Sequence, residues 1–331
     1  MSATSLALPI LDRDLESRLR ARMQEVETAL EAAVQSEAPF VTKAARHLLH
    51  AGGKRFRPLL VLLAAETGDP SGDGVVTAAC VVELTHLASL YHDDVMDEAV
   101  LRRGAESANA RWDNHVAILT GDFLFSKSSE LTAELGADAV RIQAQTFTEL
   151  VEGQILETLG PGEDEDPLEH HLRVVAGKTG SLIATSARYG ARFSGAPLEV
   201  EEALTAYGHR IGAAFQLSDD ILDIASDSDE SGKTPGTDLR EGVPTLPMLI
   251  AQRSTDPADA RLVELLASDL TDDALHREAL DLLRKHPAMD EARRYVLERA
   301  DEARELLKAL PEGSVREALD AFAELIATRT S

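Results

Sequence analysis

Two stretches of the chain, LASLYHDDVMD at residues 87–97 and AAFQLSDDILDI at residues 213–224, carry the same acidic pentad, D-D-x-x-D, within an apolar run. On an α-helix the first and last aspartates of a pentad lie about one turn apart, so their carboxylates share a face. Carboxylates crowded there repel one another and lose hydration, and a cation must compensate. Oxygen ligands without Cys or His suit Mg²⁺, which usually takes one or two carboxylates together with substrate phosphates. One pentad is as typical of a solvated helix face as of a metal site, but two copies favour a cage for Mg²⁺ and a diphosphate.

The rest of the chain predicts helix almost throughout. Apolar residues recur at three and four positions in LESRLRARMQEVETALEAAV (residues 15–34) and in MDEARRYVLERADEARELLKAL (residues 289–310). No run alternates convincingly at period two, and no Gly-rich hinge divides the 331 residues. The sequence therefore predicts one all-α domain over residues 1–331, in which residues 1–36 form a tail and a first helix for packing or dimerisation.

The charge balance limits the classes of partner. The chain has 33 Lys and Arg against 58 Asp and Glu, a formal net charge of −25, which argues against binding nucleic acid. An anionic substrate would need metal ions and a few placed cations to reverse the field locally. Three of the seven lysines, Lys54, Lys178 and Lys233, lie in Gly-containing segments, where phosphate groups are often bound.

A few features bear on the cellular setting. Cys80, the single cysteine, lies in the apolar stretch VVTAACVVELTHLA and is expected to be a buried structural thiol. The N-terminus lacks the basic start and apolar core of a signal peptide, and no run approaches 18 apolar residues. These features predict a cytoplasmic protein without a transmembrane segment.

Basic residues lie on both sides of the first pentad. GGKRFRP at residues 52–58 interrupts two helices with a cationic turn, which is either a solvated loop or a ligand-binding loop. His86 lies on the carboxylate face of the helix that carries Asp93, where it could contact the same ligand or be a core residue. Arg102 and Arg103 follow the pentad and could cap the helix end or bind phosphate oxygens; nearby metal ions favour the second role.

Later segments carry weaker signals. Residues 177–180, GKTG, offer a cation, a hydroxyl and two flexible positions between helices. Residues 226–243 are the most loop-like stretch, either a linker or a loop that closes over a bound diphosphate. His170 and His171 are adjacent, which is wrong for two ligands on one helical face, so they are assigned to the surface. Residues 255–331 carry no motif and are predicted to be scaffold.

Five motifs follow one another between residues 52 and 244: GGKRxRP, a His and DDxxD with RRG behind it, KTG, FQxxDDxxD, and GKxxGxD. In this order they resemble the trans-isoprenyl (polyprenyl) diphosphate synthase family, of the medium- or long-chain type. The resemblance implies the isoprenoid synthase fold, a single-domain bundle of mostly antiparallel helices around a deep central cavity, usually as a homodimer. Val243 departs from the family pattern, since many relatives carry Lys or Asn there. Which residues besides Lys233 would contact the diphosphate when the loop closes is therefore left open.

The resemblance also implies roles for the matching residues. About three Mg²⁺ ions on the allylic diphosphate would be held by aspartates, namely Asp93, Asp94, Asp97, Asp219, Asp220 and Asp223. The same diphosphate would contact Arg102, Lys178 and Lys233. Isopentenyl diphosphate would be bound by Gly53, Lys54, Arg57, His86 and Arg103. The reacting centre would be lined by Lys178 with Thr179 and Gln216, whose oxygens can stabilise a carbocation.

The implied activity is a Mg²⁺-dependent prenyl transfer. An allylic carbon–oxygen bond ionises only if the leaving diphosphate is stabilised, which clustered Mg²⁺, Arg and Lys supply. The allylic cation would then alkylate the double bond of isopentenyl diphosphate, and the departed diphosphate is expected to accept the proton that is lost. The product is one isoprene unit longer and can react again, and its delivery to a membrane is expected.

Product length is expected to depend on the depth of the cavity below the metal ions. Ala88 and Ser89 lie one turn before Asp93, about 6 Å down the helix, and both are small where short-chain relatives carry a bulky floor. The next helix has small side chains at Ser128 and Ser129. Phe125 and Leu135 are candidates for the bulky side chain that closes the bottom of the cavity. An open floor predicts an all-trans product of about C30 to C50; geranylgeranyl and farnesyl diphosphate synthases are the alternatives.

Rival classes would show a different pattern. A terpene cyclase would use one DDxxD but would not need GGKRFRP or RRG, because it binds no second diphosphate. A non-catalytic partner subunit has usually lost one aspartate cluster, whereas both are complete here. A metal-storage bundle would use Glu-x-x-His pairs rather than Asp pentads.

Overall fold

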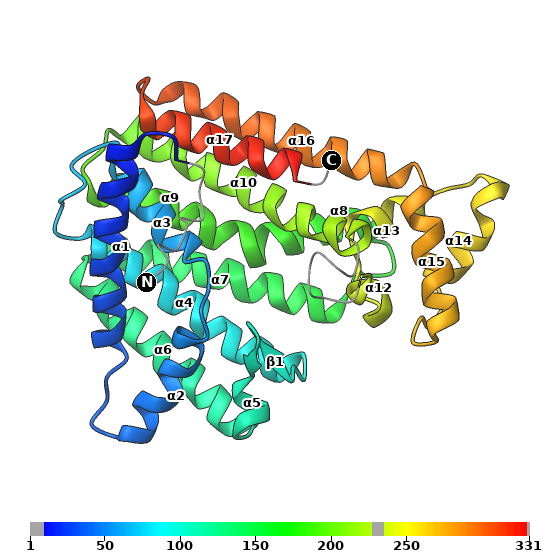
Figure 1. The fold of residues 1–331 in the computed structure, drawn as a ribbon, viewed down its shortest axis with the longest axis horizontal. Helices are drawn as coiled ribbons and strands as arrows, with labels where there is room; N and C mark the ends of the chain where they lie inside the picture. The colour runs from blue at the N-terminus through cyan, green and yellow to red at the C-terminus, as the bar shows by residue number, and fades with distance from the viewer. Residues whose placement is uncertain (1–9, 227–234, 330–331) are drawn as a thin grey trace. The chain divides into compact units, whose positions relative to one another are not determined.

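The computed structural model describes residues 10–226 and 235–329, and helices account for nearly all of their regular structure (Figure 1). In chain order the α-helices are α1 (Arg13–Ala33), α2 (Pro39–His50), α3 (Phe56–Ala65), α4 (Val75–Met96), α5 (Ala108–Arg111), α6 (Asn114–Glu134), α7 (Ala137–Leu159), α8 (Pro167–Val175), α9 (Ser181–Phe193), α10 (Leu198–Ala225), α12 (Thr237–Glu241), α13 (Leu246–Ala251), α14 (Ala260–Leu266), α15 (Asp273–Lys285), α16 (Ala288–Leu306) and α17 (Ser314–Thr328). The remaining elements are the π-turn η1 (Ala176–Gly180), the 3₁₀ turns η2 (Pro257–Asp259) and η3 (Leu307–Ala309), and the strands β1 (Leu101–Arg102) and β2 (Ala105–Glu106). The predicted all-α class is confirmed.

The chain groups into two compact units. Unit 1 comprises Met1–Phe147, Leu182–Gly208 and Leu307–Leu319, and it contains the first acidic pentad. Unit 2 comprises Thr148–Ser181, His209–Leu306 and Asp320–Ser331, and it contains the second pentad. The single domain expected over residues 1–331 therefore stays a prediction, and each unit is described by itself below.

Helix α4 forms the core of unit 1 because it is apolar on nearly every side. Leu84, Leu87 and Tyr91 are fully buried. The helix packs along α6 and also contacts α1 and α3 (Figure 1). Gly121 on α6 permits this close approach, since a Cβ there would lie 3.1 Å from the carbonyl oxygen of Ala88. Helix α4 thus carries the first pentad on a rigid, buried support.

Helix α4 is also the one helix of the described residues that is long and apolar enough to cross a membrane. The sequence, which lacks a continuous run of 18 apolar residues, predicted no such helix. However, 67% of the most apolar window of α4 is buried inside the protein. The core helix of a compact unit has the same composition, so packing against α1, α3 and α6 accounts for the apolar character of α4.

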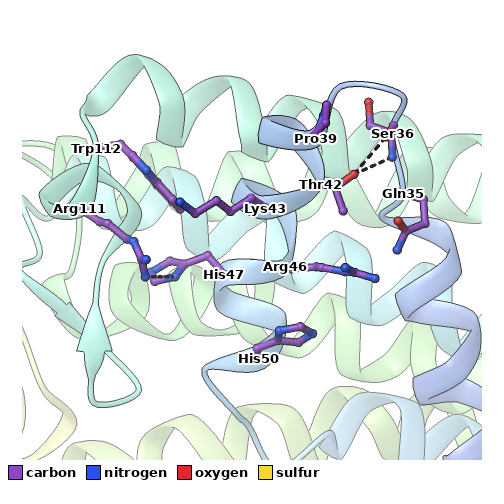
Figure 2. A pocket seen from close by; sticks show the side chains of 10 residues that line it. All are labelled: Gln35, Ser36, Pro39, Thr42, Lys43, Arg46, His47, His50, Arg111 and Trp112. Carbon is purple, nitrogen blue, oxygen red and sulfur yellow. Dashed lines mark hydrogen bonds between the residues drawn. The ribbon is translucent and has the colours of Figure 1, made fainter.

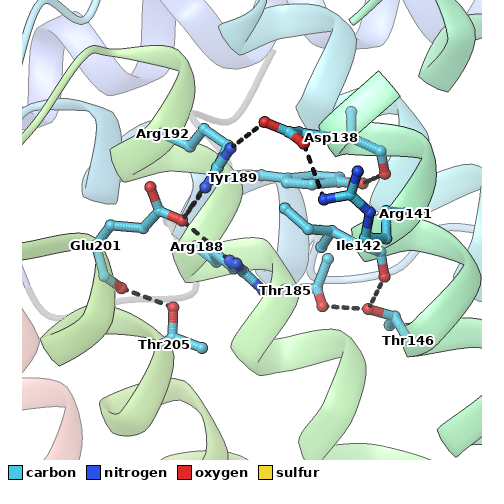
Figure 3. Close-up of polar contacts among 11 residues, drawn as sticks. Asp138, Arg141, Ile142, Thr146, Thr185, Arg188, Tyr189, Arg192, Glu201 and Thr205 are labelled. Atoms are coloured by element: carbon cyan, nitrogen blue, oxygen red, sulfur yellow. Dashed lines mark hydrogen bonds and ion pairs between the residues drawn. The ribbon is translucent and has the colours of Figure 1, made fainter. Parts of the chain in front are cut away.

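Polar contacts join α7, α9 and α10 within unit 1 (Figure 3). Glu201 on α10 is buried, and its carboxylate accepts hydrogen bonds from Arg188 and Arg192 of α9 at 2.9–3.0 Å. The hydroxyls of Thr146 on α7 and Thr185 on α9 are 2.5 Å apart. A buried carboxylate is costly unless it is paired, so the two guanidinium groups allow α9 and α10 to pack together.

Cys80 lies on the buried side of α4. Its side chain is 1% exposed, and its Sγ is 3.8 Å from the carbonyl oxygen of Val26 on α1. Burial raises the pKa of the thiol to about 12, so the reactive thiolate is scarce at neutral pH. The prediction of a buried structural thiol is confirmed.

Candidate active site

The loop GGKRFRP, residues 52–58, joins α2 to α3 through backbone conformations that favour glycine. Gly52 and Gly53 have φ of 97° and 133°, and Arg55 has a φ of 47°. A Cβ at Gly53 would also lie 2.7 Å from the guanidinium of Arg103. Glycine is therefore favoured at this position by its backbone angle, and a larger residue would also have to move the guanidinium of Arg103.

The three cations of this loop differ in their partners. Arg55 forms ion pairs with Glu27 at 2.8 Å and with Glu83 at 3.0 Å, so its charge is neutralised within the protein. Lys54 is exposed, and no carboxylate pairs with it in the described ranges. Arg57 is half-buried, and its Nε is buried without a hydrogen-bond partner. Of the three, Lys54 and Arg57 are available to an anion.

Positive charge accumulates around Arg57. The pKa of its guanidinium is lowered to about 10, first because of loss of solvation and also because Arg103 is close, whereas Glu83 opposes the shift. The pKa of His86 lies well below its ordinary value, first because of desolvation and then because Arg57 and Arg103 are close. An anion bound here would restore favourable interactions that burial has removed.

The RRG segment forms the β1–β2 hairpin, which the sequence did not predict. Its two-residue turn, Arg103–Gly104, has φ of 55° and 77°. Two positive φ values are typical of a type I′ turn, whose twist matches that of the strands it joins. Arg102 Nε donates a hydrogen bond to Asp94 Oδ1 at 2.6 Å, whereas Arg103 donates one to the carbonyl of Gly52. The hairpin thus places one arginine at the first pentad and the other at the GGKRFRP loop.

The first pentad lies at the C-terminal end of α4. Asp94 is fully buried; its Oδ1 accepts the hydrogen bond from Arg102, and its Oδ2 has no hydrogen-bond partner. Desolvation raises the pKa of Asp94 even though Arg102 acts in the opposite direction. Asp93 is half-buried, and Asp97 caps the helix with its side chain 55% exposed.

These aspartates are not drawn together around a common point. Among the described residues, no three His, Cys, Asp or Glu side chains lie close enough to hold a metal ion as placed. The donor chemistry nevertheless fits a divalent cation, because the orphaned oxygen of Asp94 is a buried anionic ligand that lacks a partner.

Two aspartates of the second pentad, Asp219 and Asp223, lie one turn apart on α10 in unit 2. Arg329 forms an ion pair with Asp219 at 2.8 Å, and its guanidinium carbon lies 4.4 Å from the ring centroid of Phe215. The carboxylate of Asp223 accepts hydrogen bonds from the first two amides of α12, each 3.2 Å long. Sequence reasoning missed Arg329, because no motif surrounds it and its partner lies 110 residues earlier.

The third aspartate, Asp220, shows that the prediction for the adjacent histidines is wrong. Its buried carboxylate accepts hydrogen bonds from His171 Nε2 at 2.8 Å and from the amide of Leu246 at 3.1 Å. His170 is 5% exposed and bonds to the carbonyl of Leu156 at 3.0 Å. Neighbouring side chains on a helix point about 100° apart. Here the side chains of both His170 and His171 contact protein groups, so neither is a solvent-facing surface residue.

The GKTG segment is helical, and Gly177 within it serves close packing. Residues 176–180 form the π-turn η1 between α8 and α9. A Cβ at Gly177 would lie 2.8 Å from the carbonyl oxygen of Glu149 on α7, and one at Gly153 on α7 would lie 2.6 Å from the amide of Lys178. The predicted flexibility is therefore wrong for Gly177, which together with Gly153 lets η1 and α7 approach each other. Such π-turns are frequent at functional sites.

The π-turn orients two of the residues predicted at the reacting centre. Thr179 Oγ1 donates a hydrogen bond to Gln216 Oε1 at 3.2 Å, so these two side chains are adjacent. Lys178 instead forms an ion pair with Glu157 of α7. A phosphate group that bound Lys178 would have to displace this carboxylate.

One predicted ligand cannot be placed. Lys233 lies outside the described residues, as do the other residues from 227 to 234 of the predicted loop at residues 226–243. Val243, the departure from the family pattern, is 37% exposed at the end of this stretch.

The two predicted chain-length positions on α4 differ in their surroundings. Ala88 is fully buried where α4 meets α6. Ser89 is half-buried, and its hydroxyl bonds only within α4, to the carbonyl of His86 at 2.8 Å. One turn earlier, Thr85 Oγ1 lies 2.8 Å from Ser128 Oγ and accepts a hydrogen bond from Gln143 at 2.7 Å.

A cavity of about 250 Å³ lies between α6 and α7 next to this polar network. Its lining consists of Phe125, Ser128, Ser129, Thr132, Val140, Gln143, Ala144 and Phe147. The ring centroids of Phe125 and Phe147 are 4.5 Å apart. Three positions named from the sequence, Phe125, Ser128 and Ser129, therefore line one cavity, but Leu135 does not, because it packs near Gly74.

An all-α protein with aspartate pentads, an orphaned buried carboxylate oxygen and cations left unpaired has the features of a protein that binds a metal-bound anion. Residues 38–283 match the family described as Polyprenyl synthetase. The chain belongs to this family. The family resemblance stated from the motifs is thereby confirmed, as is the prediction of a prenyl-transferring enzyme.

Three relatives illustrate the similarity. The chain is 49% identical over 319 residues to a nonaprenyl diphosphate synthase of Mycobacterium tuberculosis, covering 96% of this chain and 95% of that protein. Geranylgeranyl pyrophosphate synthase from Corynebacterium glutamicum, solved in complex with calcium and isoprenyl diphosphate, is 45% identical with a TM-score of 0.89, covering 98% and 99% of the chains. A decaprenyl diphosphate synthase from Rhodobacter capsulatus is 34% identical with a TM-score of 0.88, covering 96% and 99%. The calcium complex indicates divalent-metal binding within the family.

Proposed function

We propose that the protein is a Mg²⁺-dependent trans-polyprenyl diphosphate synthase that condenses an allylic diphosphate repeatedly with isopentenyl diphosphate. The observation that carries this proposal is Arg57, whose Nε is buried without a partner while Arg103 and His86 lie close by. A chain of net charge −25 has many carboxylates available for pairing, so a guanidinium left unpaired in its interior is suited to an anionic ligand.

The pentad aspartates Asp93, Asp94, Asp97, Asp219, Asp220 and Asp223 would hold about three Mg²⁺ ions. Bound Mg²⁺ would supply the charge that stabilises a leaving diphosphate. Asp94 offers its unpartnered oxygen, and Arg102 orients that carboxylate from the other side at 2.6 Å. Asp219 would exchange its ion pair with Arg329 for a metal ion. The assignment of both clusters to one diphosphate rests on the family resemblance.

The remaining predicted residues would bind the two substrates. Isopentenyl diphosphate is assigned to Gly53, Lys54, Arg57, His86 and Arg103, and the allylic diphosphate to Arg102, Lys178 and Lys233. The lowered pKa of His86 keeps its imidazole neutral near pH 7, so it would donate one N–H to an oxygen without adding charge. Thr179 and Gln216, held together by their hydrogen bond, would present oxygens to a carbocation.

The growing hydrocarbon would pass Ala88 and Ser89 toward the cavity between α6 and α7. Two phenylalanine rings in the lining would contact an isoprenoid chain through apolar surface. The small side chain of Ser129 leaves the cavity unfilled. These features support a product of about C30 to C50, within which the nonaprenyl name of the Mycobacterium tuberculosis relative falls.

A homodimer is also proposed, and exposed apolar side chains on α6 and α7 support it. Ile118 and Leu119 on α6 are 42% and 65% exposed, and Ile155 and Leu159 on α7 are 51% and 75% exposed. Exposed apolar residues that cluster on a helix mark interaction surfaces. A cytoplasmic setting and delivery of the product to a membrane stay predictions from the sequence.

The experiment that tests the proposed function is incorporation of radiolabelled isopentenyl diphosphate into farnesyl diphosphate with Mg²⁺, followed by chromatography of the dephosphorylated products. We expect a ladder that ends between about C30 and C50, and no incorporation when a chelator removes the metal. Absence of incorporation with every allylic primer would contradict the proposal. A ladder that ends at C20 would retain the reaction but assign the protein to the geranylgeranyl type.

A substitution separates the two diphosphate sites. Arg57→Ala should raise the Michaelis constant for isopentenyl diphosphate roughly ten- to a hundredfold, because a lost charge-assisted contact costs about 1.5–3 kcal/mol. Steady-state kinetics with each substrate varied in turn measures this effect. Arg141→Ala, which removes an exposed guanidinium in the same unit, should leave both constants unchanged. Selective weakening of the allylic substrate in Arg57→Ala would show that the sites are assigned wrongly.

A further inference from the structure

A second basic pocket lies in unit 1, between α2 and the end of α5 (Figure 2). It has a volume of about 650 Å³, within the range of roughly 300–1,000 Å³ that small-molecule sites occupy. Lys43, Arg46, His47 and His50 project from one face of α2, and Arg111 and Trp112 lie across from them at the end of α5 (Figure 2). None of its ten lining residues is acidic, although the chain as a whole has 58 Asp and Glu.

The cations of this pocket are only partly neutralised. Arg46 and His50 share one carboxylate, Glu31, which lies 2.9 Å from the Nε of Arg46. Lys43 and Arg111 form no ion pair within the ranges that the structure describes. In a chain with such an excess of acid, two unpaired cations facing one cavity create a local positive potential that attracts an anion.

Arg111 is held in place by His47 and Trp112 rather than by a carboxylate. Its Nη1 donates a hydrogen bond to His47 Nδ1 at 3.3 Å, and its guanidinium lies 5.1 Å from the centroid of the Trp112 ring. His47 Nε2 in turn lies 2.6 Å from the carbonyl oxygen of Glu106, to which only an N–H can donate, and this leaves Nδ1 to face Arg111. A guanidinium positioned in this way keeps donors free for phosphate oxygens, which its planar fork suits.

We propose that this pocket is a second anion site, which binds a phosphate-bearing ligand through Lys43 and Arg111. Its lining includes none of the residues assigned to isopentenyl diphosphate, which lie just before α3 and at its start, on α4 and on the hairpin turn. The carbonyl that His47 contacts belongs to β2, the strand that follows the Arg103–Gly104 turn. An anion that binds Arg111 would therefore perturb the hydrogen bonds that connect Arg111 to His47 and His47 to Glu106 of the β1–β2 hairpin.

Two sources could supply the phosphate group. One is free diphosphate, and the other is the headgroup of an anionic phospholipid. Trp112 and the exposed Phe40 lie edge to face with their centroids 5.8 Å apart beside the pocket, and such a pair suits either a shielded small anion or a membrane interface. The shared chemistry is a phosphate group bound by Lys43 and Arg111.

The only tryptophan of the chain provides a local probe of this pocket. We would measure the fluorescence of Trp112 in the full-length protein with chelator present, while titrating inorganic diphosphate in one arm and vesicles in the other. The vesicles would contain phosphatidylglycerol or, as the uncharged comparison, phosphatidylcholine. A saturable change is expected with diphosphate or with phosphatidylglycerol vesicles, and it should weaken as salt is added.

Charge-reversal variants assign the signal to its site. Lys43→Glu should weaken the apparent affinity roughly ten- to a hundredfold, because it replaces a charge-assisted contact by repulsion. Lys285→Glu, which reverses an exposed ammonium outside the pocket, should have no effect, and neither should Lys54→Ala. A response to diphosphate identifies the free anion as ligand, and a response to phosphatidylglycerol alone identifies the headgroup. No change in Trp112 fluorescence in either arm, or a response that survives Lys43→Glu and is lost in Lys54→Ala, would overturn the proposal.

Discussion

Replacing Asp94 by asparagine is expected to lower the turnover of prenyl transfer about a thousandfold while leaving the protein at least as stable as the wild type. Metal charge at the leaving group contributes several kcal/mol, and each 1.36 kcal/mol is a tenfold change in rate. Asp94 contributes a fully buried carboxylate with one oxygen unpartnered. Asparagine keeps the shape but removes the negative charge that the metal needs. Turnover is measured with both substrates saturating, and stability by thermal unfolding.

The stability expectation follows from the sign of the pKa shift. The pKa of Asp94 in the folded protein is raised, first by desolvation. The group therefore favours folding only below its ordinary pKa, and this contribution is lost as the pH rises through the folded value. The unfolding free energy of Asp94→Asn minus that of the wild type should therefore increase as the pH rises toward neutral. Asp73→Asn, at an exposed position of the same unit, is the matched control and should change neither activity nor this difference. Full activity of Asp94→Asn would refute the metal-ligand role.

Ser89→Phe is expected to shorten the final product from about C30–C50 to about C15–C20, without abolishing condensation. Ser89 is half-buried, and its hydroxyl bonds only to a carbonyl of its own helix, so a larger side chain breaks no hydrogen bond between helices. Ala88→Phe is predicted to act in the same direction. However, Ala88 is fully buried at the contact of α4 with α6, and part of its effect would be lost stability.

A graded series makes this prediction sharper. Ser129 lines the cavity between α6 and α7, and its hydroxyl bonds only to the carbonyl of Phe125 in its own helix. Ser129→Phe should therefore fill the cavity and give a product longer than that of Ser89→Phe but shorter than that of the wild type. Ser126→Phe on the same helix is exposed and outside the lining, so it should leave the ladder unchanged. A wild-type product that stops at C15, or the same product length in Ser89→Phe and Ser129→Phe as in the wild type, would show that the chain takes another path.

The histidines and glycines show where reasoning from the sequence failed. Spacing alone excluded His170 and His171 from one metal site, but it could not show that His171 reaches Asp220, 49 residues later in the chain. Similarly, the glycine at position 177 suggested freedom of the backbone. Its physical role is to let η1 lie close to Glu149 of α7, where a Cβ would not fit. The sequence does not show this contact, because the two segments meet only in the folded protein.

The sequence by itself determined the helical class, the family and the kinds of chemical group available, because apolar periodicity and acidic pentads are properties of short segments. Only the tertiary structure decided which of those groups are free to act. Arg55 and Arg57 are two residues apart in one motif, yet Arg55 is neutralised by Glu27 and Glu83 whereas Arg57 has no ion pair in the described part of the chain. Likewise Asp94 has one oxygen on Arg102 and the other without a partner. Pairing and burial depend on residues far apart in the chain, and they set the cost of leaving a charge without a ligand.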